Sequence, residues 1–195
     1  MAIESGFFSD AGLSSALTTK SFSQRDDDTS DPLDAVVYFG LPNGSKKVEA
    51  DSDPGVDQIT ISIATNIASW VASTAYVLND LMQPPTPNGY KYKCTVAGTS
   101  GASEPTYTTT IGSTFTDGTA TWTCLDEIHQ TTEIKLATSQ ANLDTATGGA
   151  SLDIGTTING GNPVAVWIRA DQGVHPVGTS SDIKLSTVDL AESVI

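Results

Sequence analysis

The sequence predicts an all-β protein, built as a β-sandwich with a small β module inserted between two of its strands and an extended N-terminal arm. Short apolar runs that alternate with polar residues recur roughly every 10 to 15 residues, with Gly, Pro and Asn between them. Thr, Ser, Gly, Asp and Ala dominate the composition, and 38% of the residues are hydrophobic. That mixture favours two thin packed sheets over helices.

Charge and hydropathy exclude two classes of partner. The formal net charge is −14, and only nine Lys and Arg residues are present, scattered along the chain. Nucleic-acid binding needs clustered cations, so we expect no nucleic-acid partner. No run approaches the roughly 18 apolar residues of a membrane span, so we expect no membrane. The first twenty residues lack a basic segment and a continuous apolar core, which predicts no secretory signal.

Residues 1–30 are predicted to form an N-terminal arm. Phe7, Phe8 and Phe22 could anchor it on a neighbour, but no strand or helix period persists. A disordered tail is an equal alternative. A short helix over Asp10–Leu17 is a further expectation, with Ser9 or Asp10 as its N-cap. The charge run Arg25–Asp28 is typical of a solvated loop.

The first flank of the sandwich, 31–67, contains three expected strands. They cover Asp34–Leu41, Lys46–Ala50 and Gln58–Ala64. In the third strand Ile59, Ile61 and Ile63 alternate with polar residues, which places all three on one face. That face must be buried.

The second flank, 127–195, resumes the same alternation. Strands are expected over Thr132–Ala137, Ser151–Ile154, Val164–Arg169 and Ser181–Ser186. Neither flank alone has enough strands to close two sheets. We therefore expect 31–67 and 127–195 to form one discontinuous, immunoglobulin-like sandwich.

Residues 68–126 are predicted to be the inserted module. The segments Asn88-Gly89 and Asp117-Gly118 lie between alternating runs, and Asn-Gly and Asp-Gly are strong hairpin signals. Insertion of such a module into an exposed loop is tolerated when its two ends lie close together.

No motif for catalysis or metal binding emerges from the chain. Nucleophilic catalysis needs a Ser or Cys beside a base, yet His129 and His175 each stand alone in a polar context. Carboxylate pairs for glycoside hydrolysis stay open, because acids are plentiful. The segment Asp51–Asp57 faintly resembles a calcium loop but lacks the closing Glu, so a β-turn is favoured. We expect no enzyme, no cofactor and no metal.

The two cysteines both fall inside the predicted module. Cys94 and Cys124 each end a strand-like stretch, and on neighbouring strands their thiols could come within disulfide reach. A disulfide there would stabilise the fold by about 3 kcal/mol. Synthesis in a reducing cytoplasm leaves the oxidation state open.

Aromatic residues of the module are the main candidates for binding. Flat aromatic faces on a β surface bind sugar rings by stacking. Tyr90, Tyr92 and Tyr107 are flanked by Thr, Lys and Pro, which favours exposure and makes them candidate glycan-binding residues. Three further aromatics of the module are expected in its core: Trp70, Tyr76 and Trp122.

A resemblance enters through four motifs in order: W-x5-Y-x2-N-D, N-G-Y-x-Y-x-C, A-G-T-S-G-x-S-E-P and D-G-T-x-T-W-x-C. About 57 residues thereby resemble the small carbohydrate-binding, chitin-binding-like modules of tailed-bacteriophage virion proteins. More weakly, the flanks resemble the immunoglobulin-like domains of phage head decoration and tail proteins, through Ile154–Ile158 and Val164–Arg169. The matching residues of the module are Trp70, Tyr76, Asn79, Asp80, Asn88, Gly89, Tyr90, Tyr92, Cys94, Gly98, Gly101, Pro105, Asp117, Gly118, Trp122 and Cys124.

This resemblance implies a virion structural protein. The expected role is a capsid decoration (cement) protein that docks on the major capsid protein, forms a homo-oligomer such as a trimer, and displays the module outward. The alternative is a tail or baseplate protein whose module recognises host-surface glycans. In either case the expected location is the virion, after synthesis in the host cytoplasm.

Overall fold

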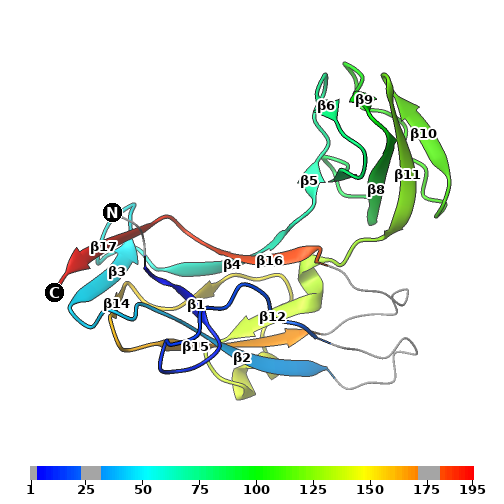
Figure 1. Cartoon of the computed structure of the whole chain (residues 1–195). Coiled ribbons are helices and arrows are strands. Elements are labelled where there is room, and N and C mark those ends of the chain that lie inside the picture. Colours follow the sequence, from blue (N-terminus) through cyan, green and yellow to red (C-terminus); the bar gives the residue numbers. More distant parts are fainter. Residues whose placement is uncertain (1–3, 23–31, 171–180) are drawn as a thin grey trace. The chain divides into compact units, whose positions relative to one another are not determined.

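The predicted all-β class is confirmed by a computed structural model, which describes residues 4–22, 32–170 and 181–195 (Figure 1). The chain forms two compact units. Unit 1 contains Met1–Ala64, Thr131–Val174 and Leu185–Ile195, and unit 2 contains Thr65–Gln130 and His175–Lys184. Among the described residues, no helix is both long and apolar enough to cross a membrane.

Unit 1 takes most of its secondary structure from strands that precede and follow unit 2 in the sequence. Two short 3-10 helices, η1 (Thr131–Glu133) and η2 (Ala141–Asp144), interrupt them. The strands are β1 (Gly6–Phe8), β2 (Leu33–Gly40), β3 (Lys46–Ala50), β4 (Thr60–Thr65), β12 (Ile134–Ala137), β13 (Leu152–Asp153), β14 (Thr157–Asn159), β15 (Val164–Ala170), β16 (Ile183–Thr187) and β17 (Leu190–Val194). Two of these strands, β4 and β16, extend by one and two residues into unit 2.

Three sheets organise these strands, in the orders β1-β2-β15-β12, β14-β3-β17 and β13-β4-β16. The longest pairing joins β2 and β15, antiparallel from Val164 opposite Phe39 to Ala170 opposite Leu33. Strands that precede residue 65 are thus hydrogen-bonded to strands that follow residue 130. Hydrophobic side chains from the facing sides of these strands make the core of unit 1, including Val37, Phe39, Val48, Ile59, Ile61, Val166 and Ile168.

Alternation in the sequence identified the buried faces correctly. Ile59, Ile61 and Ile63 are all buried, as predicted. In β15 the buried residues Val166 and Ile168 alternate with the half-buried Trp167, which lies on the other face. A β-strand reverses its side-chain direction at every residue, and this period needs no tertiary information.

The helix predicted over Asp10–Leu17 is wrong. Asp10 does cap backbone N–H groups, accepting from Ser14 at 3.2 Å and Ser15 at 2.9 Å. However, Leu13 adopts a φ of 54°, which ends any right-handed helical turn. Instead, β1 pairs with β2 and the ring of Phe7 packs edge-on against Phe39, with a centroid distance of 5.4 Å. The charge run Arg25–Asp28 lies outside the described residues.

Unit 2 has a five-stranded sheet in the order β10-β11-β8-β7-β5, together with the short pair β6-β9. The strand bounds are β5 (Ala68–Ser69), β6 (Ala75–Tyr76), β7 (Leu81–Gln83), β8 (Tyr90–Val96), β9 (Gly98–Thr99), β10 (Thr114–Asp117) and β11 (Ala120–Glu127). A separate core fills one face of this sheet, with Trp70, Met82, Tyr92, Cys94, Ala120, Trp122 and Cys124.

Candidate functional site

The aromatic cluster of unit 2 begins with β8 and β10, which direct their rings to the same face of the sheet. Tyr92 of β8 and Phe115 of β10 meet edge to face at a centroid distance of 5.4 Å. Tyr107, from the irregular chain between β9 and β10, completes the cluster at 5.3 Å from Tyr92 and 5.6 Å from Phe115. Such tilted and edge-to-face contacts are the favoured geometries of aromatic pairs.

The expected exposure of Tyr92 is wrong, because its side chain is completely buried. Its hydroxyl donates to the carbonyl oxygen of Thr108 at 2.9 Å and accepts from Nδ2 of Asn88 at 2.7 Å. Burial raises the pKa of Tyr92 above its usual range. A fully buried, fully hydrogen-bonded tyrosine is a core residue and offers no ring face to a ligand.

Tyr90 and Tyr107 differ from Tyr92 in remaining half-buried. Tyr90 lies at the start of β8, where the Asn88 side chain accepts its backbone N–H at 3.1 Å. Burial raises the pKa of Tyr107 well above its usual range, and the Glu104 carboxylate adds to this shift. Tyr107 therefore stays neutral, and both tyrosines are only half-buried, so each can offer ring surface to solvent, as stacking requires.

Phe115 is a third half-buried aromatic that the sequence reasoning missed. It lies directly opposite Trp122 in the pairing of β10 with β11. The alternation Thr-Phe-Thr before the Asp117-Gly118 turn is a signal that could have placed it on the aromatic face. Tyr90, Tyr107 and Phe115 surround Tyr92 and together form what we call the aromatic rim.

The carboxylate of Asp117 accepts two hydrogen bonds at the edge of the core of unit 2. Trp70 Nε1 donates to Oδ2 of Asp117 at 2.7 Å, and the backbone N–H of Gly101 donates to Oδ1 at 2.7 Å. The following Gly118 has a φ of 61°, and a Cβ there would lie 2.2 Å from the carbonyl oxygen of Thr99. Only glycine fits this turn. The core positions expected for Trp70 and Trp122 are confirmed, and Tyr76 packs edge-on against Trp122.

Cys94 and Cys124 are both buried, and neither forms a disulfide. They lie on the adjacent strands β8 and β11, but the register sets Cys94 opposite Trp122 and Cys124 opposite Tyr92. The two cysteines are therefore diagonal neighbours. Burial raises the pKa of the Cys94 thiol, which lowers its reactivity at neutral pH.

The acids and histidines considered in the sequence do not gather into a metal site in the part of the chain that the structure describes. No group of three or more His, Cys, Asp and Glu side chains there could hold a metal ion. The segment Asp51–Asp57 forms turns, in which Ser52 Oγ donates to the Asp57 carboxylate at 2.6 Å. His129 lies within unit 2, and His175 is outside the described residues.

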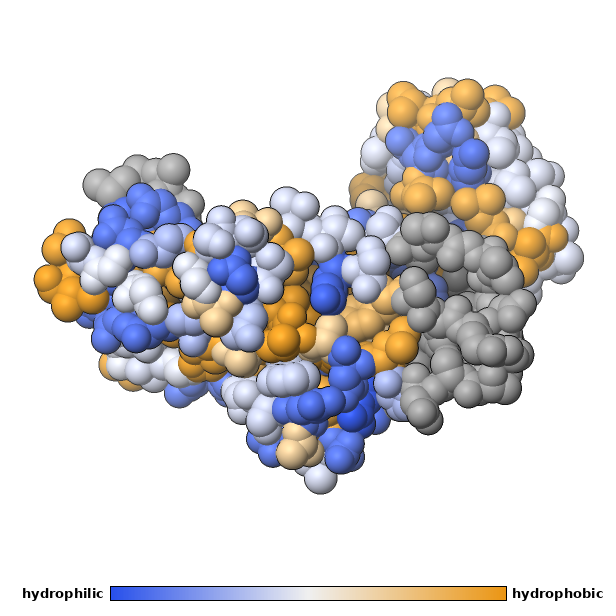
Figure 2. Space-filling model, turned by 60° about the horizontal axis from the view of Figure 1, so that its bottom comes forward, coloured by the Kyte–Doolittle hydropathy of each residue, from blue (hydrophilic) through white to orange (hydrophobic). Residues whose placement is uncertain are grey.

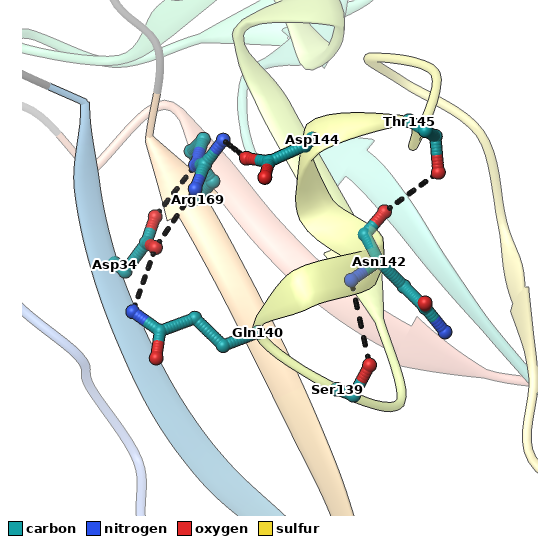
Figure 3. A network of polar contacts seen from close by, with 7 residues as sticks. All are labelled: Asp34, Ser139, Gln140, Asn142, Asp144, Thr145 and Arg169. Carbon is teal, nitrogen blue, oxygen red and sulfur yellow. Dashed lines mark hydrogen bonds and ion pairs between the residues drawn. The ribbon is translucent and has the colours of Figure 1, made fainter.

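A polar cluster in unit 1 holds η2 against the sheet (Figure 3). Arg169 of β15 lies opposite Asp34 of β2 and donates to both carboxylate oxygens, at 2.6 and 2.9 Å. It also donates to Asp144 of η2 at 2.7 Å, while Gln140 donates to Asp34 at 3.2 Å. The Arg169 guanidinium lowers the pKa of Asp34, and these carboxylates raise the pKa of Arg169. These contacts link η2 to β2 and β15, so we assign the cluster a structural role.

Comparison of the chain with protein-family models, curated proteins and solved structures found no match.

Proposed function

We propose that this protein is a non-catalytic structural protein of a tailed-phage virion, most simply a capsid decoration protein. In this proposal unit 1 is an immunoglobulin-like sandwich that docks on the major capsid protein. Unit 2 is a carbohydrate-binding-like module inserted between two of its strands and displayed outward from the capsid surface.

The observation that carries this proposal is the way the motif residues of unit 2 fold together. Trp70, Gly101 and Asp117, which belong to three separate motifs, meet in one hydrogen-bonded group. Tyr92 and Trp122, from two of the motifs, fill the core beside them. The spacing that resembles phage modules therefore corresponds to one physical unit, which strengthens the resemblance as a guide to function.

The mechanism of decoration would be burial of surface across the seams between capsomers. A protein that binds only the assembled shell stabilises it by mass action. Several copies, arranged for example as a trimer, would repeat the same contact around the symmetry axes of the shell. The acidic surface of unit 1 would fit a basic partner surface on the major capsid protein.

Abundance in purified particles tests this proposal. Quantitative mass spectrometry of virions should find the protein in amounts comparable with the major capsid protein, because a cement protein repeats with the shell. A few copies per particle would instead assign it to the tail. Absence from purified particles would overturn the proposed virion role.

A second candidate function is glycan recognition from a tail or baseplate, and the aromatic rim favours it. Tyr107→Ala and Phe115→Ala should each reduce retention on chitin or host polysaccharide without unfolding unit 2. Tyr38→Ala, at a half-buried tyrosine of unit 1, is the matched control and should leave retention unchanged. Equal retention of all variants would reject the aromatic rim as a glycan site.

A further inference from the structure

A rigid turn links β6 to β7 in unit 2. The Asp80 N–H donates to the carbonyl oxygen of Val77 at 3.1 Å, and the Val77 N–H donates back to the Asp80 carboxylate at 2.7 Å. Two further bonds tie the turn to β8: Asn79 N–H to the Cys94 carbonyl and Cys94 N–H to the Asp80 carbonyl, both 2.9 Å. Asn79 has a φ of 76°, which Asn tolerates better than most residues. The turn is therefore ordered before any partner arrives.

This ordered turn presents aliphatic side chains to solvent. Val77 is 63% exposed and Leu78 is 58% exposed. Leu81 of β7 (40%) follows the turn, and Val96 of β8 (52%) lies on the strand to which the turn is hydrogen-bonded. We call these four residues the aliphatic patch. Hydrophobic residues do reach the surface of unit 2 in Figure 2. A monomeric protein gains nothing from holding an apolar turn rigidly in water.

We propose that the aliphatic patch binds the same patch of a second copy of this chain. Residues beside the patch carry one charge of each sign: Asp80 within the turn, and Lys93, which lies opposite Leu81 on β8. Lys93 makes no ion pair with any residue that the structure describes. A surface with an apolar centre, one cation and one anion is complementary to itself across a two-fold axis, where each Lys93 can approach the partner copy's acid.

The distribution of charge supports a second copy over a strongly charged partner. Unit 2 has three basic and six acidic residues, a formal charge of −3, which leaves −11 for unit 1. Self-association through unit 2 therefore meets far less repulsion than it would through unit 1. A basic partner, by contrast, would be attracted to unit 1.

Self-association of the full chain tests the proposal. Sedimentation over a concentration series should show a reversible dimer of the 20.3 kDa chain. Leu78→Asp should weaken it at least tenfold, as replacement of a central interface residue does. The matched control is Ile111→Asp, at an equally exposed aliphatic of unit 2 outside the patch (55%), and it should leave the dimer intact. A wild-type chain that is still monomeric near about 1 mM would overturn the proposal.

A cross-linking variant gives a second readout that does not depend on affinity alone. Leu78→Cys should form an intermolecular disulfide under mild oxidation faster than Ile111→Cys, because a two-fold contact brings the two copies of position 78 together. The native cysteines are buried and do not compete. Equal rates for both variants, or dimerisation that Leu78→Asp leaves unchanged, would reject the patch as the interface.

Discussion

The indole nitrogen of Trp70 and the carboxylate of Asp117 are joined by a 2.7 Å hydrogen bond, although 47 positions separate the two residues in the chain. Both residues are buried, and the second carboxylate oxygen holds the backbone of Gly101. Asp117 also begins the glycine turn between β10 and β11. One side chain therefore connects the chain just after β5, the loop at Gly101 and the hairpin of β10 and β11.

Replacement of this carboxylate should destabilise unit 2 selectively. Asp117→Ala leaves the buried indole N–H of Trp70 and the half-buried backbone N–H of Gly101 without an acceptor, and this should cost about 3 kcal/mol of unfolding free energy. Asp117→Asn keeps one acceptor and should lose less. Urea unfolding followed by tryptophan fluorescence measures both losses. Glu104→Gln, at an exposed acid of the same unit, is the control and should change stability little. Equal stability of Asp117→Ala and Glu104→Gln would contradict the assigned role.

The buried ion pair between Lys91 and Asp182 gives a second prediction. Their charged atoms are 2.8 Å apart, and both side chains are almost fully buried. Lys91→Met should lower the unfolding free energy by about 3–5 kcal/mol, because it removes the lysine cation from the buried Asp182 carboxylate. The double variant Lys91→Met/Asp182→Leu should recover part of that loss, as a double-mutant cycle can measure.

The contrasting pair is Lys47–Glu49 in unit 1, where the Lys47 side chain is one-third exposed. Lys47→Met should lower the unfolding free energy by only about 0–1 kcal/mol, as is usual for ion pairs in contact with water. If Lys91→Met were as mild as Lys47→Met, the 91–182 pair could not be a buried anchor of unit 2.

Sequence reasoning succeeded where local chemistry decides the structure. The predicted Asp117-Gly118 turn joins β10 and β11, with Asp117 opposite Ala120. Gly118 has a positive φ, which favours glycine at this position. The strand expected over Lys46–Ala50 is confirmed to the residue. Both features are set by neighbours within a few positions along the chain.

Sequence reasoning failed where a distant segment decides the outcome. Tyr90 and Tyr92 do share one face of β8, but the chain from Gly101 to Ser113 covers that face at Tyr92 and contributes Tyr107. No periodicity marks that irregular chain, so its position could not be predicted. Strand β17 was also missed, since Leu190–Val194 shows no alternation and depends on pairing with β3.

The absence of a disulfide between Cys94 and Cys124 predicts a stability that does not depend on redox conditions. Because Cys94 and Cys124 are buried thiols outside any disulfide, a thiol reagent should label neither in the folded protein and both after unfolding. A reductant should leave the melting temperature unchanged. A drop in melting temperature on reduction, or an intact mass lower by two hydrogens, would show instead that the cysteines are bonded.

Acid should destabilise unit 1 through carboxylates with lowered pKa values. Donation from Arg169 lowers the pKa of Asp34. The pKa of Glu192 is also lowered: burial opposes this, but the N–H groups of Ser5 and Glu4 donate to its carboxylate at 2.7 and 2.6 Å. A carboxyl whose pKa is lower in the folded state than in the unfolded chain contributes stability above its unfolded pKa. That contribution is lost as the pH falls through the folded pKa.

We therefore expect the unfolding free energy to stay nearly constant from pH 7 to about 5 and to decrease below about pH 4, where unfolded carboxyls become protonated. Arg169→Met should lower stability at pH 7 and weaken the decrease in acid, because Asp34 then loses its cation. Lys20→Met, at an exposed cation, should leave the pH dependence unchanged. Urea titrations at several pH values measure the unfolding free energy of the wild type and of the two variants. An identical acid-dependent loss in Arg169→Met and the wild type would show that the Asp34–Arg169 pair does not govern acid stability.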